Sequence, residues 1–305
     1  MRSVGQLTPN PGTLRARDAT RPQPHPADRY TPGVPTAVIA FDFDPYLHVG
    51  DGVVRWETLG IAASIFGAIL LAALGGRRVG LRADDLLFVV LGIVPGAVIG
   101  GRLGYVLLHP DFFAGRPGAI LDPGVGSLEL SLAVVGGTIT GVIVASLLDG
   151  DVGRWLHAAA MPVLVVLGGG KLAMVLGGTG QGQPWLGDWA TAYLGEGPWG
   201  SLAPAVPSHP SQAYEGIATL VILVALAALF VLPSLRRPDG RAFFVAVGAW
   251  AIARALVATT WRDPLTLGPV RTEQVLDLLI AAACAIAVAV LVRRERRASP
   301  APATG

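Results

Sequence analysis

A polar segment, Ser208-His209-Pro210-Ser211-Gln212-Ala213-Tyr214-Glu215, runs without interruption into the apolar residues 216–232. Proline is favoured in the first turn of a helix, where its missing N–H costs nothing, so we expect a helix to begin at this proline. In that helix Ser211, Gln212 and Glu215 share one face, because they lie three or four residues apart. An ionisable residue on a membrane-crossing segment is by default a candidate functional site. The alternative is that these residues only cap the end of the helix.

Composition indicates an integral membrane protein. Of the 305 residues, 52% are hydrophobic and 14% are charged, and the mean hydropathy is +0.57. Cys284 is the only cysteine and lies in an apolar run, which excludes a disulfide framework and a cysteine-ligated metal site. With no metal-ligand or nucleotide motif in the sequence, we predict no metal, no cofactor and no nucleic-acid partner.

Seven apolar segments predict an all-α membrane protein with seven transmembrane helices, because each is near the roughly 20 residues that cross a bilayer. The segments are residues 58–74, 86–108, 128–148, 156–176, 213–232, 242–261 and 275–292. Residues 1–36 are rich in Pro, Arg and Thr and predict a disordered tail before a membrane domain of residues 37–293. Residues 41–56 contain Asp51-Gly52, a turn signal that favours a hairpin at the membrane surface.

The distribution of arginine predicts the orientation. Eleven arginines lie on one side: in the loops after the first, third and fifth segments, at Arg293, and in the C-terminal residues 294–305. The loops after the second, fourth and sixth segments hold three. Positive residues favour the cytoplasmic side, so we expect the N-terminus outside and a tail of residues 294–305 in the cytoplasm. The loop of residues 177–208 is then outside, and its tryptophans and tyrosine predict a small extracytoplasmic cap, residues 177–211, at the membrane surface.

With this orientation the charged residues of the segments all lie toward the outer face. Arg102, Lys171 and Arg254 lie about 8 to 10 Å below the outer ends of their segments, at 1.5 Å per residue. Glu215 and Asp277 lie just inside the outer ends of theirs, and the inner halves carry no Asp, Glu, Lys or Arg. Charges within a bilayer are costly and must be paired or hydrated. We therefore predict a polar cavity open toward the outer leaflet.

Glycine-rich runs accompany three of these segments: Gly100-Gly101-Arg102-Leu103-Gly104-Tyr105-Val106, Ala133-Val134-Val135-Gly136-Gly137 and Gly168-Gly169-Gly170-Lys171. Small residues let helices approach closely, which explains the glycines but not the cations among them. Glycine opposite a cation also leaves room for a bulky anionic group.

The chain resembles the prolipoprotein diacylglyceryl transferase family over roughly residues 41–293. His209-Pro210-Ser211-Gln212-Ala213-Tyr214-Glu215 is similar to that family's HPSQLYE motif, and residues 100–106 are similar to its GGRLGYV motif. Weaker similarities follow in order along the chain, at Phe43-Asp44-Pro45, Arg55-Trp56, Trp261-Arg262-Asp263-Pro264 and Thr272-Glu273-Gln274. Taken alone, Trp261-Arg262 is equally typical of an interfacial anchor.

Several signature positions differ from the family. Its GRxGNFxNGE signature falls at residues 170–179, where Lys171 replaces arginine and Thr179 replaces glutamate. Met174 and Gly177 replace the two asparagines, Val135 stands for the histidine of the HGG element, and the glutamate near the end of the sixth segment is replaced at Ala258. The tyrosine expected after Trp56 is also absent. A divergent enzyme and a homologue that kept the fold but lost activity are both compatible with these changes.

The resemblance implies a multi-pass enzyme of the bacterial cytoplasmic membrane, with its active site facing the outer leaflet. Its partners would be phosphatidylglycerol, other membrane lipid and the signal peptides of preprolipoproteins, and it would transfer the diacylglyceryl group to the lipobox cysteine as a thioether. We predict catalytic roles for His209, Lys171, Arg262 and Glu215. We predict substrate binding by Gly101, Arg102, Tyr105, Gly136, Gly137, Gly170, Ser211, Gln212, Tyr214 and Arg254.

The sequence leaves two other classes of protein to consider. One is a catalytically inactive, lipid-binding homologue of the enzyme. The other is a transporter or a seven-helix photoreceptor. A photoreceptor would need a Schiff-base lysine in its last helix, but the sole lysine, Lys171, is in the fourth segment, and the outward cavity offers no polar path to the cytoplasm.

Overall fold

The computed structural model describes residues 38–122, 125–148 and 150–298 of the chain. Within these residues the fold is mostly helical, and seven helices are long and apolar enough to cross a membrane. The prediction of seven membrane-spanning helices is therefore confirmed. The predicted disordered tail, residues 1–36, lies outside the described residues.

The long helices are α1 (Trp56–Arg78), α2 (Ala83–Leu108), α4 (Leu130–Leu147), α5 (Val152–Val175), α6 (Ser211–Leu229), α8 (Arg241–Val257) and α9 (Thr272–Ala298). The 3₁₀ helix η3 (Ala258–Thr260) continues α8. α1 is longer than predicted and ends with two arginines, which suit the negative C-terminal end of a helix. α9 also runs on through the basic residues that we had assigned to a separate tail.

Short elements fill the connections. They are the helices α3 (Pro110–Ala114) and α7 (Pro233–Arg236), the 3₁₀ helix η2 (Pro117–Ile120), and the strands β1 (Ile39–Phe41), β2 (Tyr46–Val49), β3 (Gly52–Arg55) and β4 (Thr191–Tyr193). β1 pairs in parallel with β4, so the segment before the hairpin is joined to the long loop between α5 and α6. That loop is therefore folded in part, while its predicted place as a cap on the outer membrane surface stays a prediction.

The predicted hairpin is present, but its turn is displaced by one residue. β2 pairs with β3 so that Val49 lies opposite Gly52, which leaves Gly50 and Asp51 as the two loop residues. The sequence predicts Asp51-Gly52 as the turn. Gly50 has φ +58°, a left-handed conformation that glycine adopts without steric cost, so Gly50 decides the register.

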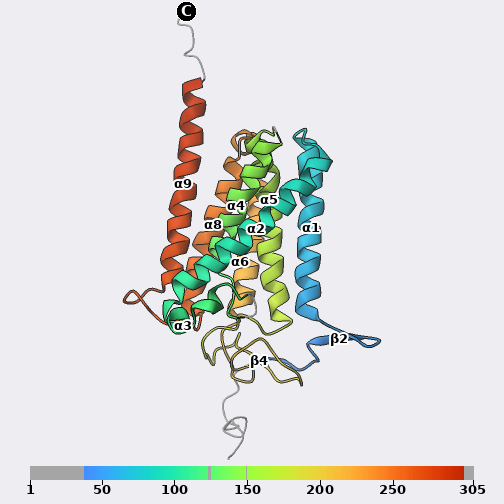
Figure 1. Cartoon of the computed structure of the whole chain (residues 1–305), viewed down its shortest axis with the longest axis vertical. Coiled ribbons are helices and arrows are strands. Elements are labelled where there is room, and N and C mark those ends of the chain that lie inside the picture. The colour runs from blue at the N-terminus through green and yellow to red at the C-terminus, as the bar shows by residue number, and fades with distance from the viewer. Residues whose placement is uncertain (1–37, 123–124, 149, 299–305) are drawn as a thin grey trace, which may run out of the picture. The chain divides into compact units, whose positions relative to one another are not determined.

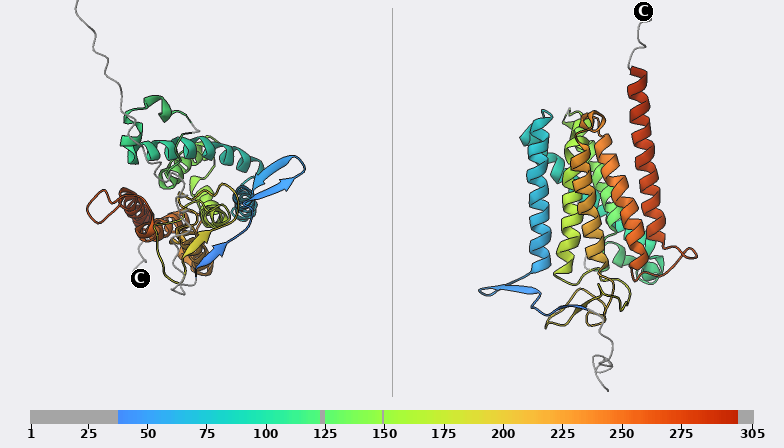
Figure 2. Two further views of the ribbon diagram at one scale, coloured as in Figure 1. Left: turned by 90° about the horizontal axis from the view of Figure 1, so that it is seen from below. Right: turned by 180° about the vertical axis from the view of Figure 1, so that it is seen from behind.

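α1 and α9 lie at opposite sides of the helical group, with α5, α6 and α8 between them (Figure 1, Figure 2). α8 is the most buried of the seven helices. Its Trp250 is fully buried in an apolar core that also includes Leu164 of α5, Leu226 of α6 and Cys284 of α9. The outer helices instead present large apolar side chains at the surface, among them Phe66, Leu107 and Ile286, as a lipid-facing surface requires.

α2 crosses α4 at very close range through glycines. A Cβ atom built on Gly136 of α4 would lie 2.2 Å from the carbonyl oxygen of Gly96 in α2, and one on Gly100 would lie 2.3 Å from the carbonyl oxygen of Leu132. These distances are far inside van der Waals contact with rigid backbone. The glycines thus serve helix packing, one of the two roles that the sequence left open.

We expect Gly136→Ala to destabilise the protein by about 1–3 kcal/mol, because its methyl group forces α2 and α4 apart. Thermal unfolding in detergent measures the effect. Gly67→Ala in α1 is the matched control, since a Cβ there meets nothing within 4 Å. An unfolding temperature for Gly136→Ala equal to that of the Gly67→Ala control would show that the helices do not touch in this way.

Candidate functional site

Arg254 of α8 is the centre of a buried cluster of charges. Only 5% of its surface is exposed. Its Nη1 donates to Glu215 Oε1 at 2.9 Å, its Nε donates to Ser131 Oγ at 3.0 Å, and its Nη2 lies 3.4 Å from Glu129 Oε1. Its Nε also lies 3.4 Å from Asp277 Oδ2. One guanidinium therefore joins α8 to α6, to α9 and to the start of α4, where it contacts both Ser131 and the N-cap residue Glu129.

Glu215 extends the cluster to a second cation. Its Oε2 lies 2.9 Å from Lys171 Nζ of α5, while its other oxygen accepts from Arg254. The Glu215 side chain is 1% exposed and the Lys171 side chain is 15% exposed. Lys171 is thus the more accessible cation, and a Cβ built on the neighbouring Gly170 would meet nothing within 4 Å.

Trp261 covers both cations with its aromatic face. Its ring centroid lies 4.5 Å from Arg254 Cζ and 5.9 Å from Lys171 Nζ. The ring of Trp250, also in α8, lies with its centroid 5.8 Å from Arg254 Cζ. The negative face of an aromatic ring attracts a cation, and more strongly where water is excluded. Trp261 therefore belongs to the site, in addition to ending the sixth span as the sequence suggested.

Three members of this cluster were not among the predicted site residues. Glu129 accepts hydrogen bonds from the backbone N–H groups of Ser131 and Leu132 and so caps the start of α4, which from sequence is indistinguishable from an ordinary N-cap. Ser131 donates to Asp277, and both side chains are fully buried. The one available signal was the carboxyl group of Asp277 inside an apolar segment.

Arg102 has a different environment. Its Nε, Nη1 and Nη2 atoms donate to backbone carbonyls of the loop that joins α2 to α4, including those of Ile120 and Val125 at 2.7 Å each. The Phe113 ring lies 5.3 Å from its Cζ. The structure therefore gives Arg102 a role in fastening this loop, and it does not bring Arg102 into contact with Arg254 or Lys171. Binding of lipid phosphate by Arg102 stays a prediction.

Arg262, in the loop between η3 and α9, and His209, just before α6, both contact the long loop that joins α5 to α6. Arg262 Nε donates to the Gly182 carbonyl at 2.5 Å, and its Nη2 donates to Ser208 Oγ at 3.0 Å. Burial lowers the pKa of Arg262 and also that of His209. His209 stacks on Trp185 with ring centroids 4.3 Å apart, and its Nδ1 has no hydrogen-bond partner among the described residues. A neutral imidazole with a free nitrogen is suited to accept a proton.

The residues predicted to share one face of α6 are nearly inaccessible: Ser211, Gln212 and Glu215. The helix begins at Ser211, one residue after the predicted position. Each side chain has its own partner: Ser211 Oγ lies 2.6 Å from Thr260 Oγ1, and Gln212 Nε2 donates to the Tyr193 hydroxyl at 2.9 Å. The face is therefore more than a helix cap, because it binds α6 to β4, α5, α8 and η3.

The remaining predicted binding residues are distributed. Tyr214 packs edge-on against His209, with ring centroids 6.2 Å apart, and Tyr105 stacks on His109 instead. Cβ atoms built on Gly101 and Gly137 would contact Glu129 and Ile93, so these glycines are used in packing. Their predicted part in binding substrate is compatible with this packing and stays a prediction.

The substituted signature position Thr179 has a carboxylate beside it. Its Oγ1 donates to Glu57 Oε2 at 2.9 Å. Glu57 Oε2 also lies 3.2 Å from Arg55 Nη2. Glu57 directly follows Trp56 in α1. The side chain at position 179, in the turn after α5, therefore contacts a carboxylate that α1 supplies.

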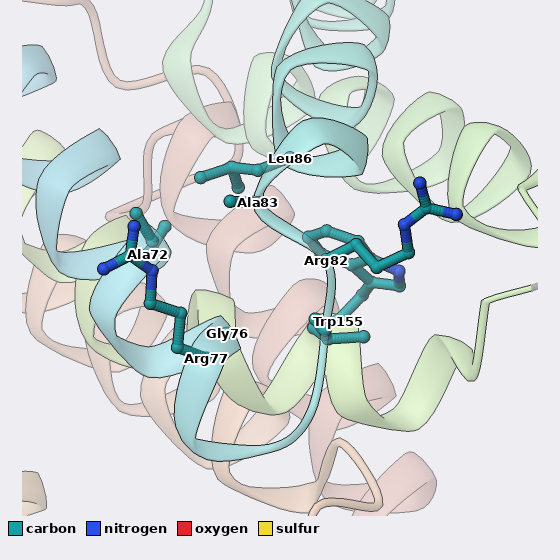
Figure 3. A pocket seen from close by; sticks show the side chains of 9 residues that line it. Ala72, Gly76, Arg77, Arg82, Ala83, Leu86 and Trp155 are labelled. Atoms are coloured by element: carbon teal, nitrogen blue, oxygen red, sulfur yellow. The ribbon is translucent and has the colours of Figure 1, made fainter.

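A small pocket lies at the other end of the helices, between α1, α2 and α5. Its cavity volume is only about 10 Å³, and it is lined by residues that include Gly76, Arg77, Arg82, Leu86 and Trp155. The guanidinium groups of Arg77 and Arg82 extend in different directions (Figure 3). They do not converge on one point as a phosphate site would require, so we assign this pocket no ligand.

The family model of prolipoprotein diacylglyceryl transferase matches residues 45–290, which is most of the chain and includes every member of the charge cluster. The chain belongs to the prolipoprotein diacylglyceryl transferase family. Among its relatives, the phosphatidylglycerol–prolipoprotein diacylglyceryl transferase of Clostridioides difficile is 24% identical over 74% of this chain and 86% of the relative. A protein of the same name from Bacillus cereus is 28% identical over 76% of this chain and 86% of the relative. One from Geobacter sulfurreducens is 28% identical over 83% of this chain and 96% of the relative.

Membership of the diacylglyceryl transferase family confirms the resemblance found from the motifs. Two of those motifs contribute residues to the charge cluster. The motif at residues 209–215 supplies Glu215 to the cluster, and the changed signature at residues 170–179 supplies Lys171. The substitution of lysine for arginine thus falls on the more accessible of the two clustered cations.

Proposed function

We propose that this chain transfers the diacylglyceryl group of phosphatidylglycerol to the lipobox cysteine of prolipoproteins. The observation that carries the proposal is the Lys171–Glu215–Arg254 cluster in a member of the diacylglyceryl transferase family. The relatives carry the name of this activity. The substrates are a phospholipid and the signal peptide of an exported protein.

The reaction is a displacement at carbon. The cysteine thiolate forms a bond to the glycerol carbon that carries the phosphate ester, and the carbon–oxygen bond breaks, so that glycerol phosphate leaves with the electron pair. The product is a thioether, and the thiol proton passes to a base. The thiolate is the nucleophile, so the site must ionise the thiol and stabilise the growing negative charge on the leaving phosphate.

We assign the stabilisation of the phosphate to Lys171. It is the most exposed charged member of the cluster, with open space beside Gly170, whereas the Arg254 guanidinium is surrounded by carboxylates. Glu215 holds both cations through its two oxygens and so acts as a positioning residue. Arg262, in the loop between η3 and α9, is a further cation that can approach a headgroup.

We assign the base to His209. Its lowered pKa keeps the imidazole neutral near pH 7, and its unpartnered Nδ1 can accept a proton. The carboxylate of Glu215 is less suited, because both of its oxygens face cations. Protonation of His209 on acidification would remove this base.

For orientation we propose that the N-terminus is outside, that the C-terminus is in the cytoplasm and that the loop of residues 177–208 is an extracytoplasmic cap in the bacterial cytoplasmic membrane. The arginine asymmetry supports this, because it places the charge cluster at the outer leaflet, where exported prolipoproteins present their cysteine.

Lys171 separates an active enzyme from an inactive lipid-binding homologue. Lys171→Arg should retain or raise transfer from phosphatidylglycerol to a lipobox peptide, because a guanidinium can bind phosphate through two hydrogen bonds. Lys171→Met should lower the rate by about 100-fold or more, as loss of one charge-stabilising group does elsewhere. Peptide mass spectrometry with purified protein measures both.

Arg78→Met is the control for loss of one cation, since Arg78 is an exposed residue at the far end of α1. Full activity of Lys171→Met would remove Lys171 from the mechanism. No transfer by wild type, Arg and Met variants alike would favour the inactive homologue.

Labelling of single cysteines in intact cells tests the orientation. Leu202 of the long loop is 91% exposed, and Cys284 is buried, so Leu202→Cys in a Cys284→Ser background places one accessible thiol. We expect an impermeant maleimide to label Leu202→Cys from outside and Arg297→Cys only after permeabilisation. The reverse pattern would overturn the orientation and the outward-facing site.

A further inference from the structure

We propose that His109, Asp263 and Glu273 form a binding site for a divalent metal ion of the Zn²⁺ type. One ligand atom from each side chain lies within 4.8 Å of the others. His109 is far from Asp263 and Glu273 in the sequence, and no motif spacing connects the three, which explains why the sequence predicted no metal. The inference does not depend on the proposed transferase activity.

The surroundings of His109 prepare it to bind a metal. Its Nδ1 lies 3.0 Å from the backbone carbonyl oxygen of Tyr105, and its ring stacks on the Tyr105 ring at 4.3 Å. A carbonyl oxygen only accepts, so Nδ1 carries the proton and Nε2 keeps its lone pair. Metal-bound histidines in proteins are generally held in this way, with the second ring nitrogen donating to a carbonyl or carboxylate. Tyr105 is not itself a ligand, so this is an observation independent of the three-residue cluster.

Asp263 is held in place through its backbone. Arg271 Nε donates to the Asp263 carbonyl at 2.8 Å, and its Nη2 donates to the Trp261 carbonyl at 2.8 Å. Arg271 is buried, and these carbonyls occupy its guanidinium. Among the described residues, neither Asp263 nor Glu273 forms an ion pair with Lys or Arg. Two carboxylates and an imidazole therefore converge without a protein cation between them.

The ligand set decides the class of metal. Imidazole nitrogen together with carboxylate oxygen is typical of Zn²⁺ sites, whereas Ca²⁺ and Mg²⁺ prefer oxygen ligands alone. Zinc bonds of about 2.1 Å in a tetrahedron place ligand atoms about 3.4 Å apart. The side chains must therefore close by roughly 1.4 Å at most from the observed spacing. Three protein ligands leave a fourth position for water or an anion.

The position in the fold suggests what the ion does. His109 ends α2, Asp263 follows η3, and Glu273 lies in the first turn of α9. A bound ion would join the α2–α3 corner to the loop between α8 and α9, and this loop carries Arg262 and Trp261 of the candidate site. The ion would act as a clasp that stabilises one end of the bundle.

Metal binding is tested on purified full-length protein in detergent, without a histidine tag and after treatment with EDTA. We expect elemental analysis and calorimetry with ZnCl₂ to give one ion per chain with micromolar or tighter affinity, and a higher unfolding temperature with Zn²⁺ than with Ca²⁺ or Mg²⁺. Co²⁺ should give the intense visible absorption of a tetrahedral site in the wild type. Affinity should fall at least about tenfold in His109→Ala, Asp263→Asn and Glu273→Gln.

The matched control is His48→Ala. His48 also lies near a carboxylate, with its Nδ1 3.5 Å from Asp44 Oδ2, but it is in the hairpin and not in the proposed metal site. This variant should bind Zn²⁺ like the wild type. Absence of stoichiometric Zn²⁺ binding, absence of a Co²⁺ spectrum, or unchanged affinity in the three ligand variants would overturn the proposal. Loss of binding in His48→Ala alone, or tighter binding of Ca²⁺ than of Zn²⁺, would do so as well.

Discussion

A guanidinium that cannot be deprotonated must be neutralised wherever the membrane excludes water, and Arg254 of α8 imposes this requirement on three other helices at once. α6 and α9 each supply a carboxylate, the residue before α4 supplies a third, and α4 supplies the hydroxyl of Ser131. Removal of one partner from such a buried pair typically costs about 3–5 kcal/mol. The position of each helix end at the site is therefore set by the geometry of one side chain.

Three further arginines at this end of the bundle donate to backbone carbonyls. Arg102 fastens the loop before α4, Arg262 fastens the long loop, and Arg271 fastens the turn before α9. Loops near a membrane surface contain carbonyls without secondary-structure partners, and a guanidinium has five donors with which to satisfy them. This use of arginine leaves Lys171, whose Nζ meets one carboxylate, as the cation most available to a lipid phosphate.

The sequence predicted the seven spans because their apolar length exceeds what a soluble helix needs, and it predicted Lys171, Glu215 and Arg254 because charge inside an apolar segment is informative. It could not predict that these three meet, because the contacts join residues far apart in the sequence. Glu129 escaped prediction because an acidic residue before an apolar helix is equally typical of an N-cap. Likewise, the GGRLGYV-like motif drew attention to Arg102 but not to the loop carbonyls that bind it. The displaced hairpin turn arose because Gly50, rather than Gly52, adopts the left-handed conformation.

The central claim is that the Arg254–Glu215 contact couples α8 to α6, and a double-mutant cycle tests it most directly. Unfolding free energies would be measured in mixed micelles for wild type, Arg254→Met, Glu215→Leu and the double variant, with transfer activity followed in parallel. We expect each single variant to be destabilised by about 3–5 kcal/mol and the double variant by clearly less than their sum, since it leaves neither partner unpaired in the Arg254–Glu215 contact. Additive effects, with a coupling energy near zero, would contradict the account.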